Sequence, residues 1–232
     1  MDERKLRRIQ RAMERSRRST NPENYNVDGT IKKGKKTWMY SNRYRKLATK
    51  RKEVYRQMAA NRKESHEKLA NKVIAMGLDV RVEEMKYQAL QKHAKQTTVN
   101  KKNGKLNKKK RFGKSLGNRA PAMFLSILDR KLHYYGQELK KVNTRELKAS
   151  QFNHITGEYI KKELKERWNV INGHKVQRDL YSAFLLENTN EDLETVNMKR
   201  INQRYESFLE LHDKEILNIK KIGSKTLQWY VA

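Results

Sequence analysis

The sequence contains no cysteine, and this absence removes three kinds of chemistry. Disulfide bonds, zinc sites built on thiolates and cysteine nucleophiles are all excluded. The chain also lacks a run of about 18 apolar residues, so we expect no segment that crosses a bilayer. Its N-terminus is basic but has neither the apolar stretch nor the small-residue cleavage site of a signal peptide. These features predict a cytoplasmic protein without a membrane partner.

Acidic residues are scarce relative to basic ones. The 232 residues include 26 Asp and Glu against 55 Lys and Arg, for a formal charge of +29. Such an excess concentrates phosphate groups around a protein and releases condensed counterions when it binds them. A merely solvated surface usually carries both signs in near balance, so polyanion binding is the better interpretation. The hydrophobic fraction of 36% is low and predicts one compact domain with a modest core.

Residues 1–76 are predicted to form a basic helical segment. Apolar residues recur at helical spacing through residues 2–18 and again through 41–76, with Lys and Arg on the other faces. The intervening residues 19–37 have no periodicity and predict a loop. Ser41 is expected to cap the second helix. The long helix is predicted to lie along a polyanion, with a partner helix or coiled coil as the alternative.

Residues 77–143 are predicted to combine a strand, a flexible basic loop and a helix. Apolar and polar residues alternate over 78–83, which indicates a strand that ends in Glu83. Residues 86–119 contain twelve Lys and Arg and no acid. The central part of this stretch is too polar to pack, so we expect it to be disordered until it meets phosphate. A helix is expected from about Ala120, followed by a short strand.

The C-terminal third divides into a polar part and a helical part. Residues 144–176 are polar and irregular in pattern. Residues 177–232 are predicted to be helical, with one helix that opens at Asp179 and a last helical region over 191–222. Eight acids against six bases from 187 to 222 favour a packing role for that region over phosphate binding.

Glu83 and Asp179 are the candidate catalytic and metal-binding residues. Nucleases of the RNase H/RuvC type gather carboxylates from strand ends and a nearby helix, because Mg²⁺ prefers oxygen ligands. Two such ions stabilise the attacking and leaving oxygens of a phosphodiester. By composition alone, the alternative that these are solvated surface acids is the stronger one.

Several stretches, taken in order, resemble the TnpB family of transposon-encoded, RuvC-like, RNA-guided DNA nucleases. KLRRIQRAMERSRR and the segment from YRKLATKRK to ANKVI are similar to its two basic helices. AMFLSILDRKLHYYGQELKKVN is similar to a later helix and strand of the family. VRVEEM resembles the "IVVEDL" strand and VQRDLYSAFL the "DRDxNAAxN" helix, which implies that Glu83 and Asp179 are the second and third RuvC acids. The resemblance covers most of residues 4–188 and implies a helix-rich α/β fold, a partial RNase H/RuvC-like domain with long basic helices, and a Mg²⁺ cofactor.

The sequence also departs from the family pattern. The strand with the first acid and the guide-binding region would precede the matched segments, so the acid set is expected to be incomplete. Residues 144–176 correspond to the family's zinc ribbon but lack its cysteines, so we expect a degenerate insert without zinc. His154 and His174 are interpreted as ordinary polar residues. Tyr181 stands where the family has Asn.

The resemblance implies a transposase-related protein that takes part in transposition and DNA recombination, with DNA and guide-like RNA as partners and a nucleoid-associated location. A separately encoded N-terminal half is a further candidate partner. Two alternatives stay open: a nuclease-dead regulator that binds RNA or DNA, and a basic ribosome-associated helical protein. The residues expected to contact nucleic acid are Arg7, Arg8, Arg11, Arg15, Arg45, Arg51, Lys52, Lys108, Lys109, Lys110, Arg111 and Arg178.

Overall fold

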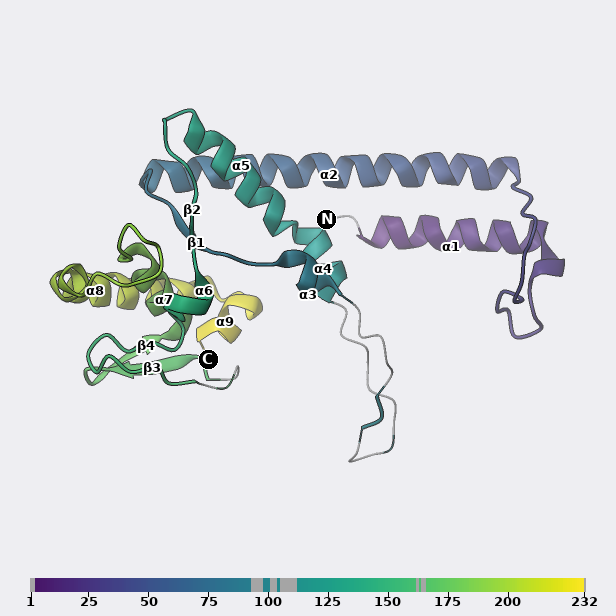
Figure 1. Ribbon diagram of the computed structural model, residues 1–232. Helices are drawn as coiled ribbons and strands as arrows, with labels where there is room; N and C mark the ends of the chain where they lie inside the picture. The colour runs from purple at the N-terminus through teal and green to yellow at the C-terminus, as the bar shows by residue number, and fades with distance from the viewer. Residues whose placement is uncertain are drawn as a thin grey trace. The chain divides into compact units, whose positions relative to one another are not determined.

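The computed structural model of the chain describes residues 3–92, 98–100, 104, 112–161, 163 and 166–231 (Figure 1). The described part is helix-rich with two small sheets, each of two strands. Instead of the single compact domain expected from the sequence, the chain separates into two compact units, residues 1–72 and 73–232. Most of the basic stretch predicted to be disordered, including Lys108, Lys109, Lys110 and Arg111, lies outside the described residues.

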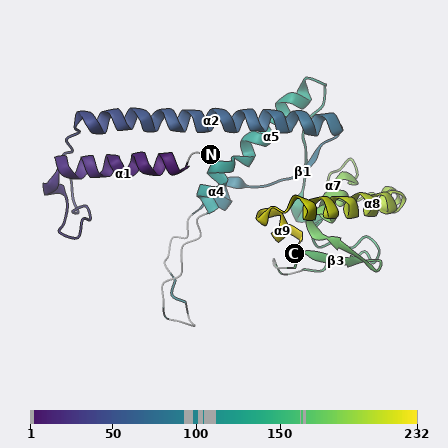
Figure 2. The same cartoon turned by 180° about the vertical axis from the view of Figure 1, so that it is seen from behind.

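The first unit is built on two helices that lie side by side, α1 (Glu3–Thr20) and α2 (Asn42–Met76) (Figures 1 and 2). Helical spacing places the buried residues of each helix on one face: Met13 and Ser16 on α1, and Val54 and Met58 on α2. The backbone N–H of Tyr44 donates to the Ser41 hydroxyl at 3.1 Å, which confirms the predicted N-cap. The short 3₁₀ helix η1 (Pro22–Asn24) follows α1.

The second unit begins with a parallel strand pair, β1 (Arg81–Glu83) and β2 (Lys140–Val142). Val82 lies opposite Lys141 in the register. Both predicted strands are present, although β1 is shorter than expected because only its last three residues pair. The helices α3 (Tyr87–Gln91), α4 (Phe112–Arg119) and α5 (Pro121–His133) connect the two strands. The first two of these helices lie at the two ends of the basic stretch, on either side of its central part.

Residues 144–176 are irregular only in part: the described residues between 148 and 167 form no helix or strand, whereas both ends of the range are regular, which the sequence did not predict. They include α6 (Thr144–Leu147) and most of an antiparallel hairpin formed by β3 (Trp168–Ile171) and β4 (His174–Gln177). The hairpin turns through Asn172 and Gly173, whose φ angles are +48° and +78°. Asn-Gly is the preferred pair for such two-residue turns, because both positions require positive φ.

Three helices complete the second unit: α7 (Arg178–Glu187), α8 (Met198–Ile222) and α9 (Lys225–Val231), all visible in Figure 2. The last predicted helical region is therefore helical only from Met198, where the Asn197 side chain accepts a hydrogen bond from Arg200 N at 3.0 Å. Within the described residues, no helix is long and apolar enough to cross a membrane. The core of this unit consists of Val142, Leu147, Ala149, Phe152, Ile171, Val176, Tyr181, Phe184, Leu185, Ile201, Tyr205, Phe208 and Leu209.

Candidate functional site

Glu83 is held at the end of β1 by its neighbour Arg81. The Arg81 side chain is only 3% exposed and pairs with Asp79 at 2.8 Å. Its guanidinium also donates to the Thr189 carbonyl and, at 2.7 Å, to the Thr189 hydroxyl, in the loop after α7. This buried arginine therefore fixes the strand against the segment that follows α7 and sets the position of Glu83.

Asp179 lies in the first turn of α7 but does not cap it. The Gln177 side chain takes that role, because its Oε1 accepts from Asp179 N at 2.6 Å and from Leu180 N at 2.9 Å. The helix begins at Arg178, one residue before the predicted start. The Asp179 carboxylate is therefore not used as the N-cap of α7.

The structure brings Glu83 and Asp179 to one pocket of about 680 Å³, which Arg81, Lys161 and Arg178 also line. Burial raises the pKa of the Glu83 carboxyl, and the negative charge of Asp179 raises it further. Among the described residues, Glu83 makes no ion pair. The site therefore contains a half-buried carboxylate whose charge is uncompensated by those residues, next to a second carboxylate.

Asp179 has basic partners on two elements. Its carboxylate lies 3.3 Å from Arg178 Nε and 3.9 Å from Arg167 Nη1. Tyr230 on α9 also lies within its electrostatic reach: burial and the charge of Asp179 raise the pKa of the Tyr230 hydroxyl to about 12. Sequence reasoning missed Arg167 and Tyr230, because the first precedes β3 and the second lies in α9, beyond the segments that resemble the family.

His212 supports the site from α8. Its side chain is 1% exposed, and its Nε2 accepts the backbone N–H of Gln177 at 2.9 Å. Its Nδ1 lies 2.8 Å from the carboxylate of Asp213. An Nε2 that accepts a hydrogen bond carries no proton, so this geometry describes a neutral ring with its hydrogen on Nδ1. No local signal in the sequence linked His212 to a residue 35 positions away.

The donor set suits a weakly held divalent cation. Two adjacent carboxylates supply the oxygen ligands that Mg²⁺ prefers, and waters would complete its coordination. Within the described residues, no three His, Asp or Glu side chains gather as a metal-binding group. Glu83 and Asp179 would hold the ion, while Arg178 and Arg167 would compete with it for Asp179.

Replacing Glu83 by Gln should stabilise the protein at neutral pH. The folded-state pKa of Glu83 is raised above its ordinary value of 4.5, so ionisation of this group opposes folding. The stabilisation should be complete well above the folded pKa and should disappear as the pH falls below 4.5, where both states of the wild type are protonated. Urea unfolding at pH 7 and pH 3.5 measures the difference.

Glu84→Gln is the matched control, because Glu84 is an exposed neighbour. It should leave the free energy of unfolding nearly unchanged at both pH values. Added Mg²⁺ should raise the unfolding midpoint of the wild type more than that of Glu83→Gln. A Glu83→Gln protein that is less stable than wild type at pH 7 would contradict this account of the site.

The two histidines considered for zinc differ in their surroundings. His154 is 3% exposed, and its Nδ1 lies 2.7 Å from the Tyr181 hydroxyl. Burial lowers the pKa of the His154 ring, which favours the neutral form. His174 is exposed on β4. His154 is therefore a buried polar residue that packs against the rings of Tyr181 and Tyr205.

Most of the arginines and lysines expected to contact nucleic acid are exposed on the helices of the first unit. On α1 these are Arg7, Arg8, Arg11 and Arg15; on α2, Arg45 and Lys52 are exposed and Arg51 is half-buried. Arg178 differs from them, since its side chain is 11% exposed and donates to the Glu166 carbonyl at 3.1 Å. It is committed to the protein interior.

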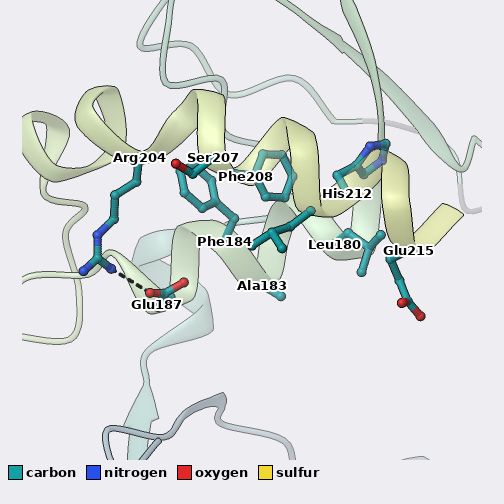
Figure 3. Close-up of a pocket in the computed structure, with 10 residues that line it drawn as sticks. Leu180, Ala183, Phe184, Glu187, Arg204, Ser207, Phe208, His212 and Glu215 are labelled. Atoms are coloured by element: carbon teal, nitrogen blue, oxygen red, sulfur yellow. Dashed lines mark hydrogen bonds and ion pairs between the residues drawn. The ribbon is translucent and has the colours of Figure 1, made fainter. Parts of the chain in front are cut away.

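A second hollow of about 720 Å³ lies between α7 and α8 (Figure 3). Phe184 and Phe208 stack within it at a centroid distance of 4.5 Å, and an ion pair of 2.7 Å joins Arg204 to Glu187 at one end. Its lining is largely apolar and includes neither Glu83 nor Asp179. The two candidate acids therefore lie in the other pocket, at β1 and α7.

Searches against protein-family models, curated proteins and solved structures give no match to this chain, so its similarity to TnpB proteins rests on the sequence motifs alone.

Proposed function

We propose that this chain is a TnpB-like nucleic-acid-binding protein that carries two of the three acids of a RuvC-like nuclease site. The observation that carries the proposal is the pairing of Glu83 and Asp179 on one pocket, from a parallel strand end and a helix start. Two segments nearly a hundred residues apart in sequence supply them. This is the arrangement that the family resemblance implies for a phosphodiester-cleaving site.

The basic helices supply the binding energy in this proposal. Exposed arginines along α1 face solvent, where they are available to phosphate oxygens. Arg7 pairs with Glu3 at 3.0 Å, but its side chain is 63% exposed, so a phosphate could displace that acid. Helix α8 carries six bases and four acids and is a packing helix in this proposal, because its buried face belongs to the core.

The free edge of β1 supports a role for a further polypeptide segment. The backbone N–H of Lys140 donates to Val80 O at 3.0 Å, and the backbone N–H of Glu84 donates to Val142 O at 3.1 Å. The backbone groups of the even-numbered residues of β1 therefore point toward β2. Alternation along a strand then directs the backbone groups of Glu83 the other way. Since β1 has one strand neighbour in the described chain, an added strand would end beside Glu83 and could supply a third carboxylate.

We expect the isolated 232-residue chain to bind DNA without cutting it. In-line displacement needs both oxygens stabilised, and two carboxylates anchor one ion poorly and a second one not at all. Incubation of the purified chain with supercoiled plasmid and Mg²⁺ or Mn²⁺ should leave the plasmid intact. Metal-dependent cleavage that Asp179→Ala abolishes and the exposed-site control Glu210→Ala preserves would show that the site is complete.

A second candidate is a regulator that binds RNA or DNA and blocks access to it. The observation that favours it is the lack of a three-ligand metal group among the described residues. The two candidates differ in their response to a polypeptide that contains the family's first strand. Restored cleavage would support the split nuclease, and binding without cleavage would support the regulator.

A further inference from the structure

The linker between α1 and α2, residues 21–41, has one defined conformation that side-chain hydrogen bonds hold in place. One buried side chain, Asn21, joins its two ends. The Asn21 Nδ2 donates to the carbonyls of Arg17 (2.8 Å) and Met39 (2.9 Å), and its Oδ1 accepts from Met39 N at 2.7 Å. A fully buried amide with three hydrogen bonds defines one arrangement of the chain ends.

A second asparagine and a tight turn fix the middle of the linker. Asn24 is 8% exposed and its Nδ2 donates to the Thr37 carbonyl at 2.8 Å. The backbone N–H of Asn26 donates to Thr30 O at 2.8 Å, and Gly29 adopts a φ of +78° in the turn between them. These hydrogen bonds hold the middle of the loop in one shape.

Two arginines of α1 are used to support the linker. The Arg18 guanidinium lies over the Tyr25 ring at 5.1 Å, and the Arg17 guanidinium lies over the Trp38 ring at 4.7 Å. Tyr25 and Trp38 themselves meet edge to face, with centroids 5.9 Å apart. Cations stacked on aromatic rings stabilise such an arrangement. These arginines are therefore engaged, and the cations available to a ligand lie elsewhere.

The fixed linker presents lysines to solvent. Lys32, Lys33 and Lys35 are exposed, and in the described structure none of them forms an ion pair. The nearest acid of the linker, Asp28, accepts hydrogen bonds from Thr30, at 2.9 Å from its backbone N–H and at 2.6 Å from its hydroxyl. Three uncompensated cations on a preformed loop favour an anionic ligand with spaced charges.

An exposed aromatic ring follows the lysines along the chain. Tyr40 is 41% exposed, and its ring stacks on Tyr44 with centroids 4.4 Å apart and an interplanar angle of 23°. Lys35 and Tyr40 are five residues apart, so their Cα atoms lie within about 18 Å of each other. A ring held flat by a neighbour provides a surface on which a nucleobase can stack.

We propose that residues 26–40 bind an unpaired nucleic-acid strand, with Lys32, Lys33 and Lys35 at its phosphates and Tyr40 against a base. This inference rests on the proposed nucleic-acid binding. It assigns that binding to one surface, residues 26–40, and to single-stranded nucleic acid. A duplex would engage the lysines but would leave Tyr40 without a role, because its bases are already stacked. An acidic protein would likewise need only the lysines.

The test compares two triple variants of the full chain with the same change in net charge. Lys32→Gln/Lys33→Gln/Lys35→Gln removes the linker cations, and the control removes three exposed lysines of α8, Lys214, Lys220 and Lys221. Binding to a labelled oligo-uridine is measured by fluorescence anisotropy across salt concentrations. The linker variant should lower the log–log salt slope by about 2, at about 0.7 for each single-strand phosphate, and the control should change it little.

Tyr40→Ala and Tyr40→Phe test the base contact, with circular dichroism to verify that each variant folds. Tyr40→Ala should weaken oligo-uridine binding about tenfold but leave duplex binding nearly unchanged, while Tyr40→Phe should retain binding. The inference would be overturned if the two triple variants changed the salt slope equally. It would also be overturned if Tyr40→Ala weakened binding to oligo-uridine and to the duplex by the same factor. A wild-type chain that binds neither strand state would overturn the proposed function itself.

Discussion

Raising the salt concentration from 50 to 200 mM should weaken binding of this chain to duplex DNA by about a thousandfold if about six phosphates are contacted. Each phosphate neutralised releases counterions from the duplex, so the log–log slope is about −0.9 per contact. The expectation follows from the formal charge of +29 and from the exposed arginines along α1. Binding driven by base recognition or apolar contact would depend far less on salt.

Electrophoretic mobility shift or anisotropy titrations at four salt concentrations measure the slope. A peptide nucleic acid of the same sequence is the matched control, because it has bases but no phosphates, and it should not bind detectably. A slope near zero on DNA would rule out phosphate-dominated binding. Comparable affinity for the phosphate-free control would do so independently.

Tyr181→Asn should cost about 4 kcal/mol of unfolding free energy, although Asn is the residue of the family motif. Tyr181 is fully buried in the core of the second unit. Loss of a large buried ring leaves a cavity, and truncations of this size cost about 3–5 kcal/mol. The hydroxyl also lies 2.7 Å from His154 Nδ1 and 3.2 Å from His154 N, so both groups would lose a partner.

Tyr181→Phe separates the ring from the hydroxyl. It keeps the packing and should cost about 1–2 kcal/mol, because only the hydrogen bonds to His154 are lost. Denaturant unfolding followed by far-ultraviolet circular dichroism gives both values. Similar stability of the Asn variant and the wild type would mean that Tyr181 is not part of the packed core.

Short-range patterns in the sequence predicted the elements that depend on neighbouring residues alone. The helical spacing of apolar residues located α1 and α2, and a single hydroxyl predicted the Ser41 cap. Both expected strands, β1 and β2, are present, but their pairing with each other was not predicted. Glu83 and Asp179 line one pocket. The fold beyond helix-rich α/β stays a prediction, since its RNase H/RuvC-like identity depends on resemblance.

What the sequence did not predict depends on short strands and distant contacts. The β3–β4 hairpin was overlooked because its strands of four residues lie in a polar stretch, although Asn172 and Gly173 supplied a turn signal. His212, Arg167 and Tyr230 reach the acid pocket only through the tertiary fold. Hydrophobic periodicity over a short stretch of sequence cannot predict contacts between residues that are far apart in the chain.

Gln177 has a practical consequence for anyone who prepares this protein. The same residue caps α7, donates its backbone N–H to His212 Nε2 and donates through its side-chain Nε2 to the Tyr230 carbonyl at 3.4 Å. Helix α9 is thereby connected to the start of the helix that bears Asp179. Proteolysis between α8 and α9 would therefore free the Gln177 amide and loosen that junction. Preparations for binding experiments should be checked by mass spectrometry for retention of residues 225–231.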